Sequence, residues 1–138
     1  MAIPPLVFIT GASSGIGQAL AARFARAGYR LALVARRTAE TQAWADAQSF
    51  TAEQCRIYPA DVSDTDALVA AAKACLTAQG LPTVVIANAG ISIGMDTAER
   101  GDIDVMARTF ATNNTGLAAT FHPFVSAMCA RGSGTLVG

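Results

Sequence analysis

Short apolar runs alternate along the chain with segments whose apolar residues recur every three or four positions. The apolar runs predict five β-strands, at residues 6–10, 30–35, 56–58, 83–87 and 135–137. The periodic segments predict four helices. The first follows the glycine-rich turn 11–17 and stops at Gly28, and the second spans 38–49 with Thr38 as its cap. The third spans 65–79 and the fourth 102–130. In the first helix, Ile16, Leu20 and Phe24 should share one face.

The order of these elements predicts the fold class. Strands that are wholly apolar are covered on both faces, and helical crossovers between them imply parallel pairing with right-handed connections. We expect a single domain over residues 1–138, a doubly wound, Rossmann-like, three-layer α/β/α fold with strand order 3-2-1-4-5. The chain stops within its fifth strand, so we expect a sheet that is incomplete at the C-terminus, in the front half of a longer domain.

Counting the layers predicts which strands are left uncovered. The first two helices should cover one face over the first three strands, and the third and the long helix should cover the other face. No helix then remains for the first face of the fourth and fifth strands. We therefore expect partly exposed side chains among Val84, Val85, Ile86, Leu136 and Val137.

Composition limits the classes of function. Of the 138 residues, 52% are hydrophobic and 14% are charged, which excludes a disordered chain. Ten basic and ten acidic side chains give no net charge for binding nucleic acid or an anionic membrane. The apolar start is shorter than the roughly 20 residues of a membrane span, and no basic residue precedes it.

Cysteine and histidine usage favours a reducing compartment and argues against metal chemistry. Cys55, Cys75 and Cys129 are spaced for neither zinc nor a disulfide framework, so we expect buried thiols in a cytoplasmic protein. His122 is the only histidine, and a structural role is favoured for it. No metal site is expected.

The segment 10–17, Thr-Gly-Ala-Ser-Ser-Gly-Ile-Gly, lies between the first predicted strand and the first predicted helix. Glycines there permit a sharp turn, close approach of a ligand to the backbone, and close packing of the helix on the strand. The first helical amide groups face the turn, where a pyrophosphate fits. A purely structural turn is the alternative. The candidate cofactor-binding residues are Gly11, Ser13, Ser14, Gly15, Ile16 and Gly17.

The end of the second predicted strand indicates the kind of nucleotide. An acidic residue there would bind ribose hydroxyls, but this chain has Ala35 followed by Arg36 and Arg37. A guanidinium forms short, charge-assisted bonds to phosphate, so the pattern favours NADP over NAD. The missing acid also argues against a methyl donor such as S-adenosylmethionine, whose ribose is usually held by one. The alternative is that both arginines are solvated surface charges.

An apolar stripe surrounds one amide side chain in the long predicted helix. The stripe consists of Ile103, Met106, Phe110, Leu117, Phe121, Phe124 and Met128. Asn113 falls between Phe110 and Leu117, so its side chain should be buried and hydrogen-bonded. A hydrogen-bonded core asparagine with no further role is one interpretation.

Four blocks of the sequence resemble the short-chain dehydrogenase/reductase family, in its order and spacing: 10–17, Asp61-Val62, Asn88-Ala89-Gly90, and Asn113 with Gly116. The resemblance implies that the glycine turn binds the cofactor phosphates and that Asp61 meets the adenine amino group, with Val62 beside the ring. It implies that Asn88, Ala89 and Gly90 lie behind the adenosine ribose. Arg36 then marks an NADP-preferring member, and Asn113 helps to hold a water of the proton relay.

The same resemblance implies an NADP-dependent oxidoreductase that interconverts an alcohol and a carbonyl by hydride transfer, as a homodimer or homotetramer. The family's acid/base pair is a tyrosine followed four residues later by a lysine, and this sequence lacks it. Four residues after Tyr29 and Tyr58 stand Leu33 and Val62. Four residues before Lys73, the only lysine, stands Val69. We therefore expect this chain to carry the cofactor-binding half and to be inactive alone. The alternative is a non-catalytic nucleotide-binding or regulatory module on the same fold.

Overall fold

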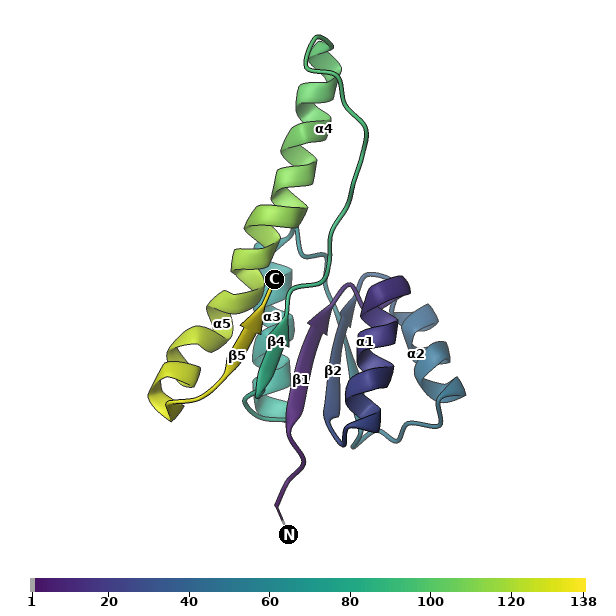
Figure 1. The fold of residues 1–138 in the computed structure, drawn as a ribbon, viewed down its shortest axis with the longest axis vertical. Helices are drawn as coiled ribbons and strands as arrows, with labels where there is room; N and C mark the ends of the chain where they lie inside the picture. The colour runs from purple at the N-terminus through teal and green to yellow at the C-terminus, as the bar shows by residue number, and fades with distance from the viewer. Residues whose placement is uncertain (1) are drawn as a thin grey trace.

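A five-stranded sheet lies at the centre of the computed structural model, which describes residues 2–138 (Figure 1). Its strands are β1 (Leu6–Thr10), β2 (Arg30–Ala35), β3 (Cys55–Pro59), β4 (Val84–Ile86) and β5 (Thr135–Val137). The helices are α1 (Gly15–Arg26), α2 (Thr38–Ala47), α3 (Thr65–Ala78), α4 (Arg100–Phe110) and α5 (Gly116–Arg131). A π-helical segment, Ala111–Thr115, joins α4 to α5.

The strand order is β3-β2-β1-β4-β5, and every neighbouring pair is parallel, which confirms the predicted topology. The central strand is β1, whose Val7 pairs with Leu31 of β2 and with Val84 of β4. Because all strands run in the same direction, the segments that follow them leave the sheet at one edge.

Successive residues of β1 point to opposite faces of the sheet and belong to two hydrophobic clusters. Leu6 and Phe8 lie in the cluster that α3 and α5 complete, where the rings of Phe8 and Phe124 meet edge-on with centroids 4.9 Å apart. Val7 and Ile9 lie in the cluster on the other face, with residues of α1 and α2. The expected division of the helices between the two faces is therefore confirmed (Figure 1).

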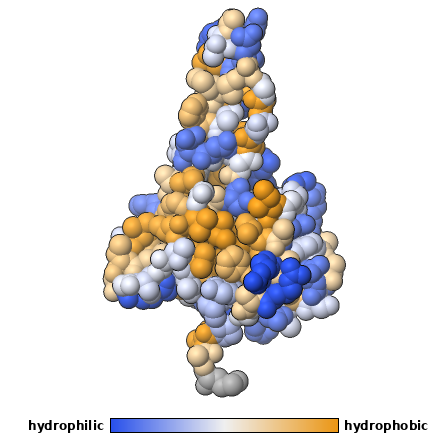
Figure 2. Space-filling model, in the orientation of Figure 1, coloured by the Kyte–Doolittle hydropathy of each residue, from blue (hydrophilic) through white to orange (hydrophobic). Residues whose placement is uncertain are grey.

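The side chains of β4 and β5, which were expected to be partly exposed because no helix remains to cover one face of these strands, differ in burial. The expectation is wrong for β4: Val84 and Ile86 are buried in the cluster that contains α1 residues, and Val85 in the one that contains α5 residues. It is confirmed for β5, where Leu136 and Val137 are 40% and 42% exposed. Figure 2 shows apolar residues gathered around β5 on this side of the molecule.

The long helix predicted at 102–130 is divided in the structure. It begins at Arg100, and the π segment interrupts its α-helical geometry. No residue of α4 is buried, because this helix extends past the sheet (Figure 1). Ile103 and Phe110 are 37% and 53% exposed, so the first half of the predicted apolar stripe is not core. In α5, Phe124 and Met128 are buried as predicted.

One local prediction near a helix start is wrong. Thr38 is the first residue of α2 rather than its cap; Arg37 holds the cap position, and the Thr41 hydroxyl donates to the Arg37 carbonyl oxygen at 3.0 Å. In α1, Leu20 and Phe24 pack against the core, whereas Ile16, predicted on the same face, is 73% exposed. It lies in the first turn of the helix and lines the cleft described below.

Other boundaries follow the local sequence signals. Gly28 adopts a left-handed conformation, with φ 85°, just after α1 ends. Asp64 caps α3 by accepting a hydrogen bond from the amide of Ala67 at 3.0 Å. No helix within residues 2–138 has the length and apolar character needed to cross a membrane.

Candidate nucleotide-binding site

A cleft of about 730 Å³ opens at the carboxyl edge of the sheet. It is lined by segments that follow β1, β2, β3 and β4, together with residues of α4 and the π segment. A crevice in this position is the usual ligand site of an open α/β sheet. The predicted cofactor-binding residues that line it are Gly11, Ser13, Ser14, Gly15, Ile16, Arg36, Arg37, Asp61, Val62, Asn88, Ala89 and Gly90.

The three glycines of the turn have different roles. Gly11 is left-handed, with φ +66°, and a Cβ there would lie 2.8 Å from the Cα of Ala89. Gly17 does not line the cleft, and a Cβ there would overlap the carbonyl oxygen of Gly11, so it permits close packing behind the turn. Gly15, with φ +56°, has nothing within 4 Å of a Cβ position. Bare backbone at Gly15 therefore leaves room for a ligand.

Hydrogen bonds fix the glycine turn to the segment that follows β4. The Asn88 side-chain amide donates to the carbonyl oxygens of Thr10 and Gly11, at 3.1 and 3.2 Å. The backbone amide of Ala89 donates to the Thr10 hydroxyl at 3.1 Å. Two walls of the cleft are thus held together without a ligand.

The start of α1 is suited to an anion. Ser14 stands at the cap position with an extended backbone, its side chain caps no amide, and the first turn has no acidic residue. The first amide groups of a helix carry partial positive charge and bind anions. Ser14, Gly15 and Ile16 all line the cleft, so this end of the helix faces the space where a ligand would lie.

The charged side chains that line the cleft are mostly basic. They are Arg36, Arg37 and Arg108, with Asp61 as the acidic member among the described residues. The guanidinium of Arg36 lies 3.8 Å from the carboxylate of Asp61, which is a loose and exposed ion pair. An anion entering the cleft would therefore meet more positive than negative charge.

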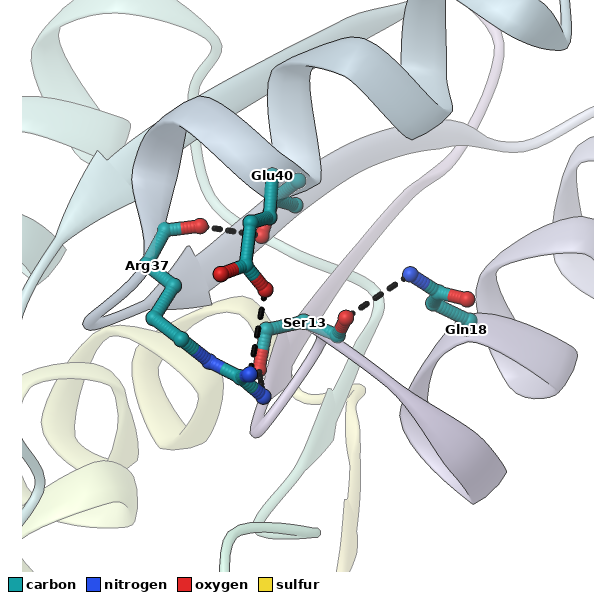
Figure 3. A network of polar contacts seen from close by, with 5 residues as sticks. Ser13, Gln18, Arg37 and Glu40 are labelled. Atoms are coloured by element: carbon teal, nitrogen blue, oxygen red, sulfur yellow. Dashed lines mark hydrogen bonds and ion pairs between the residues drawn. The ribbon is translucent and has the colours of Figure 1, made fainter.

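Arg37 connects the start of α2 to the glycine turn (Figure 3). Its Nη1 lies 3.0 Å from Glu40 Oε2, and its Nη2 donates to the Ser13 hydroxyl at 3.2 Å. The side chain of Gln18 donates to the carbonyl oxygen of Ser13 at 2.8 Å, from the α1 side. Ser13 is therefore held by both neighbouring helices.

Asp61 is held as a carboxylate. The Ser63 hydroxyl and the Ser63 amide both donate to its Oδ1, at 2.7 and 2.9 Å. These bonds, with a smaller contribution from Arg36, keep the pKa of Asp61 below the usual 3.8. The charged group can accept hydrogen bonds from a ligand throughout the neutral range.

Asn113 anchors the loop that follows β4. Its Oδ1 accepts from the amide of Ile91 at 2.8 Å, and its Nδ2 donates to the carbonyl oxygen of Ile91 at 2.7 Å. The expected hydrogen bonding is confirmed, although the side chain is half-buried rather than enclosed in a stripe of core residues. Asn113 does not line the cleft, and its part in a proton relay stays a prediction.

The structure adds residues that the sequence alone does not single out. These lining residues are Ala60, Ser63, Ile91, Ile93, Arg108, Ala111 and Thr112. The spacing of Asp61 and Ser63, typical of a side chain that binds backbone two residues on, could have indicated Ser63. Nothing in the sequence indicates Arg108, whose place depends on the direction of α4. Residues 2–138 contain no group of three or more side chains that could hold a metal ion.

The parallel sheet, its strand order and the cleft at its carboxyl edge define a Rossmann-like α/β protein. The chain belongs to the short chain dehydrogenase family, whose model matches residues 5–138.

Characterised and uncharacterised relatives agree with this assignment. An uncharacterized oxidoreductase of Myxococcus xanthus is 35% identical over 130 residues, covering 94% of this chain and 51% of the relative. A sulfoacetaldehyde reductase of Chromohalobacter salexigens is 32% identical over 131 residues, covering 95% and 51%. A short-chain dehydrogenase structure from Streptomyces avermitilis has a TM-score of 0.87 at 26% identity and covers 99% of this chain and 48% of its own. The chain thus spans about half the length of these relatives.

Proposed function

We propose that this chain is the cofactor-binding half of an NADP-dependent oxidoreductase that interconverts an alcohol and a carbonyl group. The observation that carries the choice of cofactor is the pair Arg36 and Arg37, which follows β2 and lines the cleft. A ribose-binding acid at this place would repel a 2′-phosphate, whereas a guanidinium binds it. Membership of the short chain dehydrogenase family and the relative named as a sulfoacetaldehyde reductase support the reaction class.

The cleft fits this cofactor from its phosphates to its adenine. Gly15 and the uncapped start of α1 would hold the pyrophosphate, and Arg36 would hold the 2′-phosphate. The Asp61 carboxylate would accept a hydrogen bond from the adenine amino group, with Val62 against the ring. When bound, the nicotinamide supplies or takes up the hydride.

The segment after β4 would form the wall behind the ribose, through Asn88, Ala89 and Gly90. Because both ends of the Asn113 amide are engaged by Ile91, the side chain of Asn113 would act by holding this segment in place. We further propose a small alcohol or carbonyl compound as the substrate, a cytoplasmic location, and a homodimer or homotetramer for the complete protein. The unburied helix α4 supports an assembly in which another surface covers it.

Substitution of Arg36 tests the cofactor assignment. Arg36→Asp should weaken NADP binding by about 1.5–3 kcal/mol, or roughly ten- to a hundredfold, because it replaces a charge-assisted bond with a repulsion. Affinity for NAD should fall much less, or improve. Titration of each variant with NADPH and NADH, followed by the fluorescence of the bound nicotinamide, measures both effects.

Arg56→Asp is the matched control, since it makes the same change of charge at an exposed position outside the cleft. It should leave the ratio of the two affinities unchanged. Equal losses of NADPH and NADH binding in Arg36→Asp would remove Arg36 from this role.

A further inference from the structure

The two arginines that follow β2 are held very differently. Arg37 has a close carboxylate partner, Glu40, at 3.0 Å, and also donates to the Ser13 hydroxyl (Figure 3). Arg36 has only the loose contact of 3.8 Å with Asp61. That contact is to Oδ2 of Asp61, while its Oδ1 accepts both hydrogen bonds from Ser63. Of the two guanidinium groups, that of Arg36 is therefore the freer to meet an incoming phosphate.

Glu40 forms its ion pair with Arg37 from outside the cleft. It lies three residues after Arg37, in the first turn of α2, so the helix itself fixes the pair in register. The two side chains are 54% and 60% exposed, and Glu40 does not line the cleft. A carboxylate here offsets the charge of a cleft-lining arginine without offering a ligand any group of its own.

We propose that Glu40 is a specificity-determining residue, which lowers the preference for a 2′-phosphate by neutralising Arg37 and holding it against the glycine turn. This inference rests on the proposed NADP-dependent function. Arg37 then acts mainly as a connection between α2 and Ser13, and Arg36 supplies most of the attraction for the phosphate. The cleft then discriminates less strongly between NADP and NAD.

The expected size of the effect follows from the exposure of the pair. Exposed ion pairs contribute about 0.2–1 kcal/mol, because water screens both charges and the side chains lose freedom. Releasing Arg37 from Glu40 should therefore strengthen binding of a 2′-phosphate by no more than about fivefold. A larger change would require a buried pair, which this is not.

The test measures NADPH and NADH affinities of Glu40→Gln by fluorescence titration of the 138-residue chain. Glutamine keeps the length of the side chain and can still accept a hydrogen bond from Arg37, so only the charge is removed. NADPH should bind about two- to fivefold more tightly, and NADH should be unchanged. Glu40→Ala, which removes the whole carboxylate, should change NADPH binding in the same direction.

Glu53→Gln is the matched control, because it removes the same charge from the exposed segment before β3, at the opposite edge of the sheet from the cleft. It should leave both affinities unchanged. In an Arg37→Gln background, Glu40→Gln should no longer strengthen NADPH binding, since its effect passes through Arg37. A gain that persists there, or equal changes for both cofactors, overturns the inference.

The two proposals can fail separately. If Arg36→Asp weakens NADPH selectively while Glu40→Gln changes nothing, the inference about Glu40 is wrong and the NADP assignment stands. If Arg36→Asp weakens both cofactors equally, the NADP assignment fails, whatever Glu40→Gln does.

Discussion

Gly15 and Gly28 share a backbone conformation but not a location. Both are left-handed, with φ +56° and +85°, and both have open space where a Cβ would lie. Only Gly15 lines the cleft. An L-residue in this conformation costs about 1–2 kcal/mol, and somewhat more with a branched Cβ. Substitutions at these two glycines therefore cause similar backbone strain, but only the one at Gly15 also places a side chain in the cleft.

We expect Gly15→Val to abolish NADPH binding, because its branched side chain would occupy the space in which the backbone meets the pyrophosphate. Gly28→Val should suffer a similar loss of unfolding free energy and keep full binding. Thermal unfolding and the fluorescence enhancement of NADPH measure the two quantities. An unchanged enhancement in Gly15→Val would mean that the turn is only structural.

At the scale of elements, the π segment and the loop after β4 form one unit. Asn113 supplies the connection, because it satisfies both the amide and the carbonyl group of Ile91. Gly90 is part of the same contact, since a Cβ there would lie 3.3 Å from Asn113 Oδ1. The cleft-lining residues of the loop thus depend on a side chain that does not itself line the cleft.

Asn113→Ala should destabilise the chain by about 1–3 kcal/mol, because two backbone groups of Ile91 lose their partners. The amide of Ile91 should exchange its hydrogen faster, which hydrogen-exchange measurements would detect. Asn114→Ala, at the exposed neighbouring position, should change stability by less than about 0.5 kcal/mol. Equal protection of Ile91 in both variants would contradict the anchoring role.

Local signals predicted the sheet better than they predicted the helices. The bounds of β1 and β2 agree with the sequence prediction because uniform apolar runs end there at turn signals. The prediction that Thr38 caps α2 was wrong by one residue, because Arg37 takes the cap position without a side-chain hydrogen bond and so without the residue type that indicates a cap. The π segment has no signature in the apolar spacing, which continues through it unchanged.

The candidate site was predictable where it lies next to strand ends. Parallel strands bring the segments after β1, β2, β3 and β4 to one edge, so residues far apart in sequence line one cleft. Arg108 could not be predicted, because its position depends on where α4 lies beyond the sheet. The role proposed for Glu40 could not be predicted either, because it depends on where the side chain of Arg37 lies.

At the scale of the whole molecule, apolar surface is concentrated at β5. Leu136 and Val137 are 40% and 42% exposed there, and Figure 2 shows apolar residues around this strand. The outer edge of β5 pairs with no strand of the described sheet, in which β5 comes last. Exposed apolar faces and unpaired strand edges both favour association.

We expect the 138-residue chain to associate in solution and to show no NADPH-linked carbonyl reduction, since its sequence lacks the Tyr-x-x-x-Lys acid/base pair. Light scattering over a range of concentrations and an absorbance assay with carbonyl compounds measure the two properties. Replacing both Leu136 and Val137 by threonine should reduce association, because threonine retains strand propensity and adds a polar group. A monomeric, active chain would contradict both expectations.

The π segment also determines where the length of this polypeptide can change. Removing one residue from Ala111–Thr115 would rotate all of α5 by about 100° relative to α4. Gly116 would turn away from Val62, whose carbonyl oxygen lies 2.9 Å from a Cβ position there, and a bulkier residue would take its place. Residues 92–99 form no helix or strand, so an added or deleted residue there does not rotate α5 relative to α4. Natural variation in length should therefore occur before α4 and be excluded between α4 and α5.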